Sequence, residues 1–135
     1  MADVPAAVTD THALVFHAAG SRVLGRHAAK HFAACEAQEA LLYVPAAVIW
    51  EVGLLARVSR ISLRRPVREF FETLFTNPAY QPLDLSPQHI YDADELRFTR
   101  DPFDGLIVAS ARALGLPLIT RDVAIGESGA VRVLW

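Results

Sequence analysis

Five short apolar runs, separated by segments with helix signals, limit this chain to very few folds. The runs cover residues 5–9, 41–44, 81–85, 116–120 and 131–134. Most of them lack the polar alternation of half-exposed strands, which is typical of parallel strands buried on both faces. The sequence therefore predicts a single α/β domain over residues 1–135, with a central parallel five-stranded sheet and helices on both faces.

Helix signals between the runs place the expected helices. Caps and prolines mark their starts, because a side-chain oxygen satisfies free backbone N–H groups and proline fits the first turn. Gly115 follows an apolar segment and predicts a left-handed end for the last helix. The expected helices run from Ser21 to about Glu39, from Pro45 to about Ala56, from Pro66 to Leu74, from Pro87 to about Leu96, and from Pro102 to Gly115.

Composition excludes several classes of protein. The 135 residues are 53% apolar and 21% charged, which is too hydrophobic for a disordered chain and sufficient for one core. Cys35 is the only cysteine, so neither an intrachain disulfide nor a cysteine zinc cluster can form. The sequence lacks a G-K-[ST] phosphate loop, a signal-peptide pattern and a run of roughly 18 apolar residues. We therefore expect a cytoplasmic protein without a membrane segment.

Two aspartates directly follow predicted strands. Asp10 comes after the first run, and Asp122 comes after the fourth. Considered alone, either is explained as an ordinary loop acid or a helix cap. In an open α/β sheet, however, ligands bind beyond the carboxyl ends of the strands. The two aspartates would lie on the same edge of the sheet, which makes both of them candidates for a functional site.

Two further acids have unusual neighbours. Glu51 lies within residues 46–55, a stretch that is otherwise wholly apolar. A buried carboxylate without a partner costs several kcal/mol, so Glu51 needs either solvent or a partner such as a metal ion. Asp104 falls at the third position of a helix that Asp101 and Pro102 would start, where it also suits the helix dipole. Because that helix continues as a nearly apolar segment, we expect its N-terminus to face a cleft.

Four carboxylates on separate elements form the kind of ligand set that a hard cation prefers. Magnesium is held by a few carboxylates and water molecules, and it pairs with phosphate oxygens. Two such ions about 4 Å apart can activate water and stabilise the leaving oxygen of a phosphodiester. Polar neighbours of these acids are candidate substrate contacts, namely Thr11, His12, Arg100, Thr120 and Arg121.

Four stretches give the sequence a resemblance to a known family. They read V-T-D-T-H-A-L-V at 8–15, V-I-W-E-V at 48–52, R-D-P-F-D-G-L-I-V-A at 100–109 and L-I-T-R-D at 118–122. The sequence resembles the PIN-domain ribonucleases, in particular the VapC-type toxins of bacterial toxin–antitoxin systems. By position, the resemblance makes Asp10, Glu51, Asp104 and Asp122 the catalytic and metal-binding acids, which would use Mg²⁺ or Mn²⁺ to cleave RNA.

The resemblance also implies partners. Members of the family commonly form homodimers, and a small VapB-like antitoxin wraps the toxin and covers its cleft. The chain departs from the family's usual pattern because no lysine follows Glu51 closely and Gly105 stands where relatives often have arginine, so RNA contacts would differ. Four aromatic residues would either line a groove for the antitoxin or belong to the core, namely Trp50, Phe70, Phe71 and Phe75.

Two other functions fit the same residues. A catalytically inert PIN-like module would bind RNA or a protein without cleaving RNA. A metal-dependent phosphatase of another α/β family would use similar acids, but the aspartyl-phosphate type has a second aspartate where this chain has His12. The net charge of −2 argues at first sight against nucleic acid. If the four acids line one pocket, however, the remaining surface carries a net charge of +2, so RNA binding would need the metal.

Overall fold

A computed structural model describes residues 4–135, so the first three residues of the expected domain lie outside the described part. Five strands form one sheet in the order β3-β2-β1-β4-β5, and all neighbouring strands are parallel. This confirms the α/β fold with a central parallel five-stranded sheet. The strands are β1 (Ala6–Thr9), β2 (Leu41–Pro45), β3 (Tyr80–Leu83), β4 (Leu118–Ile119) and β5 (Val133–Leu134).

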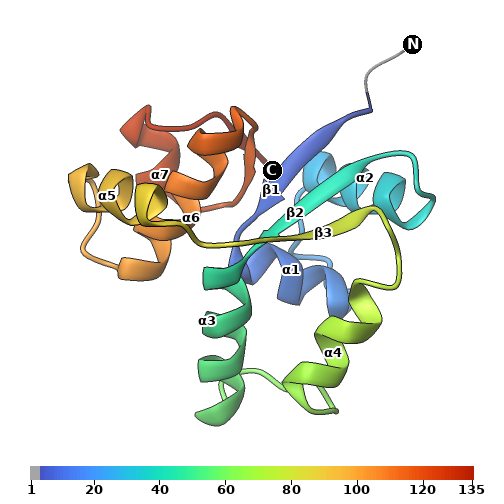
Figure 1. Cartoon of the computed structure of the whole chain (residues 1–135). Coiled ribbons are helices and arrows are strands. Elements are labelled where there is room, and N and C mark those ends of the chain that lie inside the picture. Colours follow the sequence, from blue (N-terminus) through green and yellow to red (C-terminus); the bar gives the residue numbers. More distant parts are fainter. Residues whose placement is uncertain (1–3) are drawn as a thin grey trace.

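Helices connect the strands and cover the sheet. Figure 1 shows α5, α6 and α7 grouped on one side of the strands and α1 and α2 on the other, whereas α3 and α4 project away from the sheet. Among the described residues, no helix has the length and apolar character needed to cross a membrane. The helices are α1 (Thr11–Ala18), α2 (Arg26–Glu36), α3 (Ala46–Arg57), α4 (Val67–Leu74), α5 (Pro87–Glu95), α6 (Pro102–Leu114) and α7 (Val123–Ser128).

The order of the strands reverses at β1. Strands β2 and β3 extend the sheet on one side of β1, and β4 and β5 extend it on the other. Val8 therefore lies opposite both Tyr43 of β2 and Leu118 of β4. In open α/β sheets a crevice forms at such a reversal, outside the carboxyl ends of the strands. The fold thus places a crevice next to the residues that follow β1 and β4.

The core consists of the central strands and the helix faces that pack on them. Val8 of β1 and both Leu42 and Val44 of β2 are fully buried. On α6, the apolar segment noted in the sequence is buried at Ile107 and Val108. This packing fixes α6 against β1, so the N-terminus of α6 is held at the edge of the sheet where the crevice lies.

Capping residues set the ends of α5 and α6 as the sequence predicts. Asp101 caps α6 by accepting a hydrogen bond from the N–H of Phe103 (2.8 Å). Ser86 caps α5 by accepting one from the N–H of His89 (3.3 Å). Gly115 ends α6 in the left-handed conformation (φ +65°), which favours glycine because it has no Cβ. These three predictions are confirmed.

The helix predicted from Ser21 to Glu39 is wrong at its start. The Ser21 hydroxyl accepts a hydrogen bond from the N–H of Val23 in a turn (3.1 Å), and α2 begins only at Arg26. The residues before this turn form a separate helix, α1, which the sequence analysis missed. The apolar side chains of α1 point to all sides of the helix and do not form a stripe on one face. Its sequence therefore lacks the periodic pattern of a surface helix.

Helix α7 was also missed, and the five strands differ from their predicted ranges, β1 and β2 by one residue at one end and the other three by more. The helix has only six residues, which is too short for a periodic pattern to show. The end of a strand is set by the last residue that pairs with a neighbouring strand. The end of an apolar run in the sequence is set by burial, which continues beyond the paired residues. The ranges predicted as 81–85, 116–120 and 131–134 are therefore corrected to Tyr80–Leu83, Leu118–Ile119 and Val133–Leu134.

Close packing of Trp135 explains the glycine before α2. Gly25 is the residue at the N-terminal cap of α2, and a Cβ there would lie 2.5 Å from the Trp135 side chain. The carbonyl oxygen of Trp135 accepts a hydrogen bond from the N–H of His27 (3.3 Å), and its ring packs edge-on against Phe16 of α1. Trp135 thereby links α2 to α1.

Truncation of Leu42 tests the packing of the central sheet. Leu42→Ala should lower the free energy of unfolding by about 2–5 kcal/mol, because apolar contacts are lost and a cavity remains. Urea unfolding followed by circular dichroism measures the loss. Leu114→Ala is the matched control, since this side chain is 38% exposed, and it should cost less than about 1 kcal/mol. Equal losses in the two variants would contradict this packing.

Candidate active site

An acidic cleft of about 360 Å³ opens at the carboxyl edge of the sheet. Its walls come from the start of α1, the middle of α3, the start of α6 and the segment between β4 and α7. The fold therefore brings together all four acids that the sequence analysis selected. The residues lining the cleft are Asp10, Thr11, His12, Glu51, Asp101, Asp104, Ile107, Arg121 and Asp122.

Asp10 and Asp122 enter the cleft from neighbouring strands. Because β1 and β4 pair directly and in parallel, the residues that follow them meet at one edge. Asp10 caps α1 by accepting the N–H of Ala13 (2.8 Å), and Asp122 caps α7 by accepting the N–H of Ile125 (2.9 Å). Both aspartates are thus helix caps, as the simpler interpretation expected, and both also line the cleft.

Thr120 supports these two aspartates from within the protein. Its side chain is fully buried, and its hydroxyl oxygen accepts the N–H of Asp122 (3.1 Å). Hydrogen bonding between Thr120 and the Asp10 carboxylate favours the ionised form of Asp10. The sequence analysis placed Thr120 among the substrate contacts. Thr120 is not among the residues that line the cleft and its hydroxyl holds the acids, while a substrate contact stays a prediction.

Glu51 reaches the cleft from the middle of α3, where it is half-buried. The Thr11 hydroxyl donates a hydrogen bond to Glu51 Oε1 (2.5 Å). This bond is the partner that a carboxylate in an apolar helix requires. Thr11 is 1% exposed and lines the cleft, so its hydroxyl orients Glu51, and its contact with a substrate stays a prediction. Thr11 therefore fixes the position of one acid from the start of α1.

Helix α6 contributes two acids. Asp104 is half-buried, and Asp101 is exposed and accepts the N–H groups of Phe103 (2.8 Å) and of Asp104 (3.3 Å). From the sequence, Asp101 is expected only to cap α6, whereas the structure also places it in the cleft. The sequence does hold an indication of this second role. Asp101 is three residues before Asp104, and residues at this spacing lie on one face of a helix.

The crowded acids disfavour their own ionisation. Burial, followed by the negative charges of Asp101 and Asp122, raises the pKa of Asp104 from 3.8 to about 7. Burial also raises the pKa of Asp10 and of Glu51, although hydrogen bonds to threonine hydroxyls oppose the rise in both. A positive ligand would relieve this repulsion. The cleft therefore has the electrostatic character of a cation site.

The cleft acids form no ion pair within the described residues, although the nearby His12 opposes the rise in the pKa of Asp10 and of Glu51. Within residues 4–135, the ion pairs of the structure lie outside the cleft. Arg121 lines the cleft, but its guanidinium carbon lies over the Phe16 ring, 4.9 Å from the centroid. Phe16 also contacts the ring of His12, with 6.2 Å between centroids. The negative charge of the acids is thus available to a ligand.

Carboxylate oxygens are the ligands that Mg²⁺ and Mn²⁺ prefer, so the chemistry of the cleft fits such an ion. Across residues 4–135, no three acidic, histidine or cysteine side chains are already arranged around one ion position. Magnesium commonly binds through one or two carboxylates and keeps several water molecules. The cleft therefore fits a hydrated divalent cation, with water completing the coordination.

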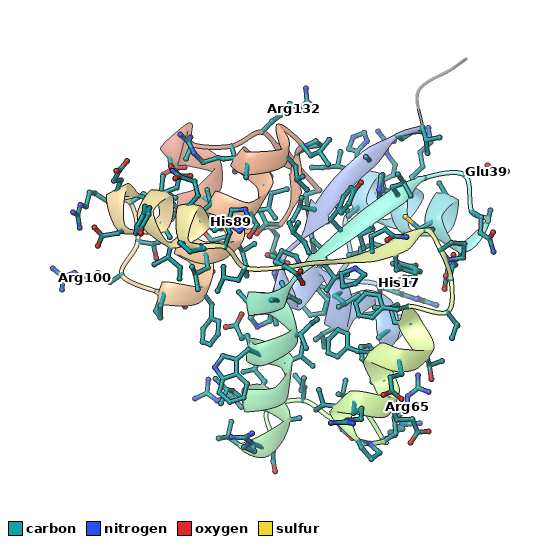
Figure 2. All side chains as sticks on the ribbon, in the orientation of Figure 1. His17, Glu39, Arg65, His89, Arg100 and Arg132 are labelled. Carbon is teal, nitrogen blue, oxygen red and sulfur yellow. The ribbon has the colours of Figure 1, made fainter. Side chains whose placement is uncertain are left out.

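The remaining predicted contacts divide into two groups. His12 and Arg121 line the cleft and stay candidates for binding a substrate. Arg100 is exposed on the loop before α6 and does not line the cleft, and its side chain is directed away from the strands (Figure 2). A contact between Arg100 and a substrate therefore stays a prediction that the cleft itself does not support.

A family profile decides the relationship of this chain to known proteins. The profile of the PIN domain matches residues 7–127. The chain belongs to the PIN domain family. The matched range of this PIN domain includes every residue that lines the acidic cleft. Among curated proteins, no sequence matches it significantly.

Solved structures share the fold of this PIN domain over nearly its whole length. VapBC2 from Rickettsia felis, bound to a DNA fragment of its promoter, matches 95% of this chain and 96% of its own, with 14% identity and a TM-score of 0.66. A toxin–antitoxin complex from Klebsiella pneumoniae matches 93% and 94%, with 21% identity and a TM-score of 0.63. DNA-bound VapBC from Salmonella typhimurium matches 97% of both chains, with 15% identity and a TM-score of 0.65. These identities establish a common fold.

Replacement of Asp104 tests the charge repulsion in the cleft. In metal-free buffer, Asp104→Asn should stabilise the PIN domain near pH 8 and have little effect near pH 4. The folded-state pKa of about 7 lies above the ordinary value of 3.8, so between these values the folded state binds more protons than the unfolded state. Wild-type stability therefore falls as pH rises through this window. Urea unfolding at several pH values measures the difference.

Asp94→Asn is the matched control for this measurement, because it removes an exposed carboxylate of α5 that lies outside the cleft. A stabilisation by Asp104→Asn that does not grow with pH, or that Asp94→Asn reproduces, would contradict the repulsion described for the acidic cleft.

Proposed function

We propose that this PIN domain, residues 1–135, is a metal-dependent endoribonuclease that hydrolyses RNA phosphodiester bonds and is the toxin of a type II toxin–antitoxin system. The observation that carries the proposal is the convergence of Asp10, Glu51, Asp104 and Asp122 in one cleft, where none of them forms an ion pair among the described residues. Phosphodiester hydrolysis requires an activated water molecule and stabilisation of negative charge, and bound divalent ions supply both. Membership of the PIN domain family supports the same chemistry.

The proposed roles follow from how each acid is held. Asp10 and Asp104 would be the principal ligands of Mg²⁺ or Mn²⁺, because Asp10 directly follows the central strand β1 and Asp104 lines the same cleft from the start of α6. Glu51 and Asp122 complete the site directly or through water and position the attacking hydroxide. Thr11 keeps Glu51 in place during the reaction through its hydrogen bond.

Two further residues extend the site toward the substrate. His12 and Arg121 line the same cleft as the acids. Arg121 remains charged at any physiological pH and can donate two hydrogen bonds to one phosphate. We assign to it, together with His12, the contact with the RNA phosphates next to the bond that is cleaved.

The proposed partners come from the solved structures of similar fold. The Klebsiella pneumoniae neighbour is a toxin–antitoxin complex, and its fold covers 93% of this chain. A small VapB-like antitoxin is therefore the expected partner here, and the toxin is expected to act as a homodimer in the bacterial cytoplasm. The site that the antitoxin must block is the acidic cleft.

The aromatic residues expected to form an antitoxin groove lie in different environments. Trp50 is 53% exposed. Phe70 and Phe71 are buried in the core, and Phe75 packs against it. The groove interpretation is thus corrected for these three phenylalanines, which belong to the core or pack against it, while Trp50 is exposed to a partner or substrate.

One observation favours a second candidate, a catalytically inert PIN-like module that binds RNA or a protein. Among residues 4–135, three ligands are not already arranged around an ion. An inert module would bind no metal at these acids, whereas a nuclease must assemble its site around the ion. Metal binding therefore separates the two candidates before any RNA is added.

RNA cleavage tests the proposed chemistry. The purified chain should cut RNA in the presence of Mg²⁺ or Mn²⁺, and EDTA should abolish cleavage. Asp104→Asn should reduce the rate at least about 100-fold, because removal of a group that stabilises transition-state charge typically costs this much. Asp94→Asn is the control for a lost surface carboxylate and should keep full activity. Undiminished cleavage with EDTA and with Asp104→Asn would contradict the carboxylate–metal mechanism.

Thermal unfolding with added Mn²⁺ tests metal binding alone. Binding to the folded state raises its stability by about 2.7 kcal/mol when the ion is at 100 times its dissociation constant. The wild type should therefore unfold at a higher temperature in Mn²⁺, and Asp104→Asn should lose most of the shift. An unchanged unfolding temperature at millimolar Mn²⁺ would favour the inert module.

A further inference from the structure

An arginine-rich segment joins α3 to α4. We call residues 57–68 the arginine segment, and they read R-V-S-R-I-S-L-R-R-P-V-R. The segment has five of the thirteen basic residues of the chain and no acid. The remainder of the chain has eight basic and fifteen acidic residues, which is a net charge of −7. Positive charge is therefore concentrated in one short part of the surface.

The charges of the arginine segment are available to a ligand. All five arginines are exposed, and within residues 4–135 none of them forms an ion pair. Arg65 lies beside α4 (Figure 2), where it donates to the Thr73 hydroxyl (3.3 Å) and lies over the Phe70 ring (5.6 Å to the centroid). These contacts orient Arg65 without neutralising it. Glu69 and Glu72 follow the segment on α4, but neither forms an ion pair with its arginines within residues 4–135.

Two surface hollows lie along the arginine segment. One, of about 450 Å³, is lined by Arg60 and Arg65 together with Ser59 and Ser62. The other, of about 340 Å³, is lined by Arg64 and Arg65 together with Ser62. Guanidinium groups bind phosphate through two parallel hydrogen bonds, and hydroxyl groups add further donors. The hollows therefore have the donors and the charge that a phosphate group needs.

Helix α3 connects this segment to the acidic cleft. Glu51 lies in the cleft, and Arg57 follows about 9 Å farther along the helix axis. Trp50, next to Glu51, is 53% exposed, and the Arg57 guanidinium carbon lies 5.2 Å from the centroid of its ring. Exposed aromatic rings bind single-stranded nucleic acids by stacking on bases. Helix α3 thus carries the exposed Trp50 next to a cleft acid, and the first arginine lies toward its C-terminal end.

We propose that Trp50 and the arginine segment form a track for single-stranded RNA that leads to the acidic cleft. The arginines bind backbone phosphates, and a base stacks on Trp50. The inference rests on the proposed ribonuclease function, since it describes how the substrate of that site is held. A membrane surface fits less well, because membrane-binding helices expose bulky apolar side chains beside their basic residues. In the track only Trp50 and Val58 are exposed large apolar residues among those described, which is too few for the apolar face of such a helix, and Ile61 and Leu63 pack on the core.

The salt dependence of RNA binding tests the arginines. Fluorescence anisotropy with a labelled single-stranded RNA, in Mg²⁺ and rising KCl, uses the full chain carrying Asp104→Asn so that RNA stays intact. Each phosphate contact contributes about 0.7 to the slope of log K against log salt. Adding Arg60→Gln and Arg64→Gln should therefore lower the slope by about 1.4 and weaken binding roughly tenfold at low salt.

The matched control replaces two exposed arginines elsewhere, Arg97→Gln with Arg132→Gln, which removes the same charge. Arg132 lies at the end of the molecule opposite Arg65 (Figure 2). This control should keep the wild-type slope. An equal change of slope in both double variants would overturn the proposal, because binding would then follow net charge and not the track.

Trp50→Ala tests the stacking. Base stacking on an aromatic ring corresponds to a loss of about 5- to 100-fold in affinity when the ring is removed. The salt slope should stay unchanged, since no charge is lost. Tyr91→Ala is the control, because Tyr91 is an aromatic residue of α5 with 61% exposure. Unchanged affinity in Trp50→Ala would overturn the stacking role.

The outcomes separate this inference from the ribonuclease proposal. A chain that binds RNA through the track but does not cleave it would refute the nuclease and leave the track standing. A chain that cleaves RNA, with Arg60→Gln and Arg64→Gln binding like the control, would refute the track alone. Binding to phosphatidylserine vesicles that needs these arginines, while RNA affinity does not, would also overturn it.

Discussion

The direct pairing of β1 with β4 is the constraint on which the rest of the molecule depends. It makes residues that are distant in the chain follow adjacent strands, so Asp10 and Asp122 leave the sheet side by side. Each aspartate then caps the helix that follows it, and this ties the position of the acid to the direction of the helix. Burial of α6 against β1 adds Asp104 from a third direction. The fold and the cleft are therefore consequences of one strand order.

The acidic cleft is held together against its own repulsion. Burial opposes the ionised form of Asp10, Glu51 and Asp104, and the neighbouring charges oppose it further. The core offsets this cost in free energy. Apolar side chains of α3 and α6 pack in the core, and this packing does not depend on whether the cleft acids are ionised. Active sites commonly lower the stability of a fold in this way, and a ligand of opposite charge restores it.

The sequence was sufficient for the fold class and for the acids because both depend on local patterns. Apolar runs indicate buried parallel strands, and the carboxyl ends of such strands meet at one edge. It was insufficient where a residue acts through a distant neighbour. The bond from Thr11 to Glu51 and the support that Thr120 gives to Asp10 join separate elements, so no spacing in the sequence indicates them. Helix α1 was missed for a different reason. Its apolar residues lie on all of its faces, so the sequence shows no helical periodicity of apolar and polar residues.

The glycine before α2 has a consequence for the rim of the cleft. Gly25 leaves room for the side chain of Trp135, and the Trp135 ring packs edge-on against the Phe16 ring. The guanidinium of Arg121 lies over this same Phe16 ring. A larger residue at position 25 would displace the indole and, through Phe16, the arginine. In a mutational scan scored by activity, Gly25 would therefore register as an active-site position, although it does not line the cleft.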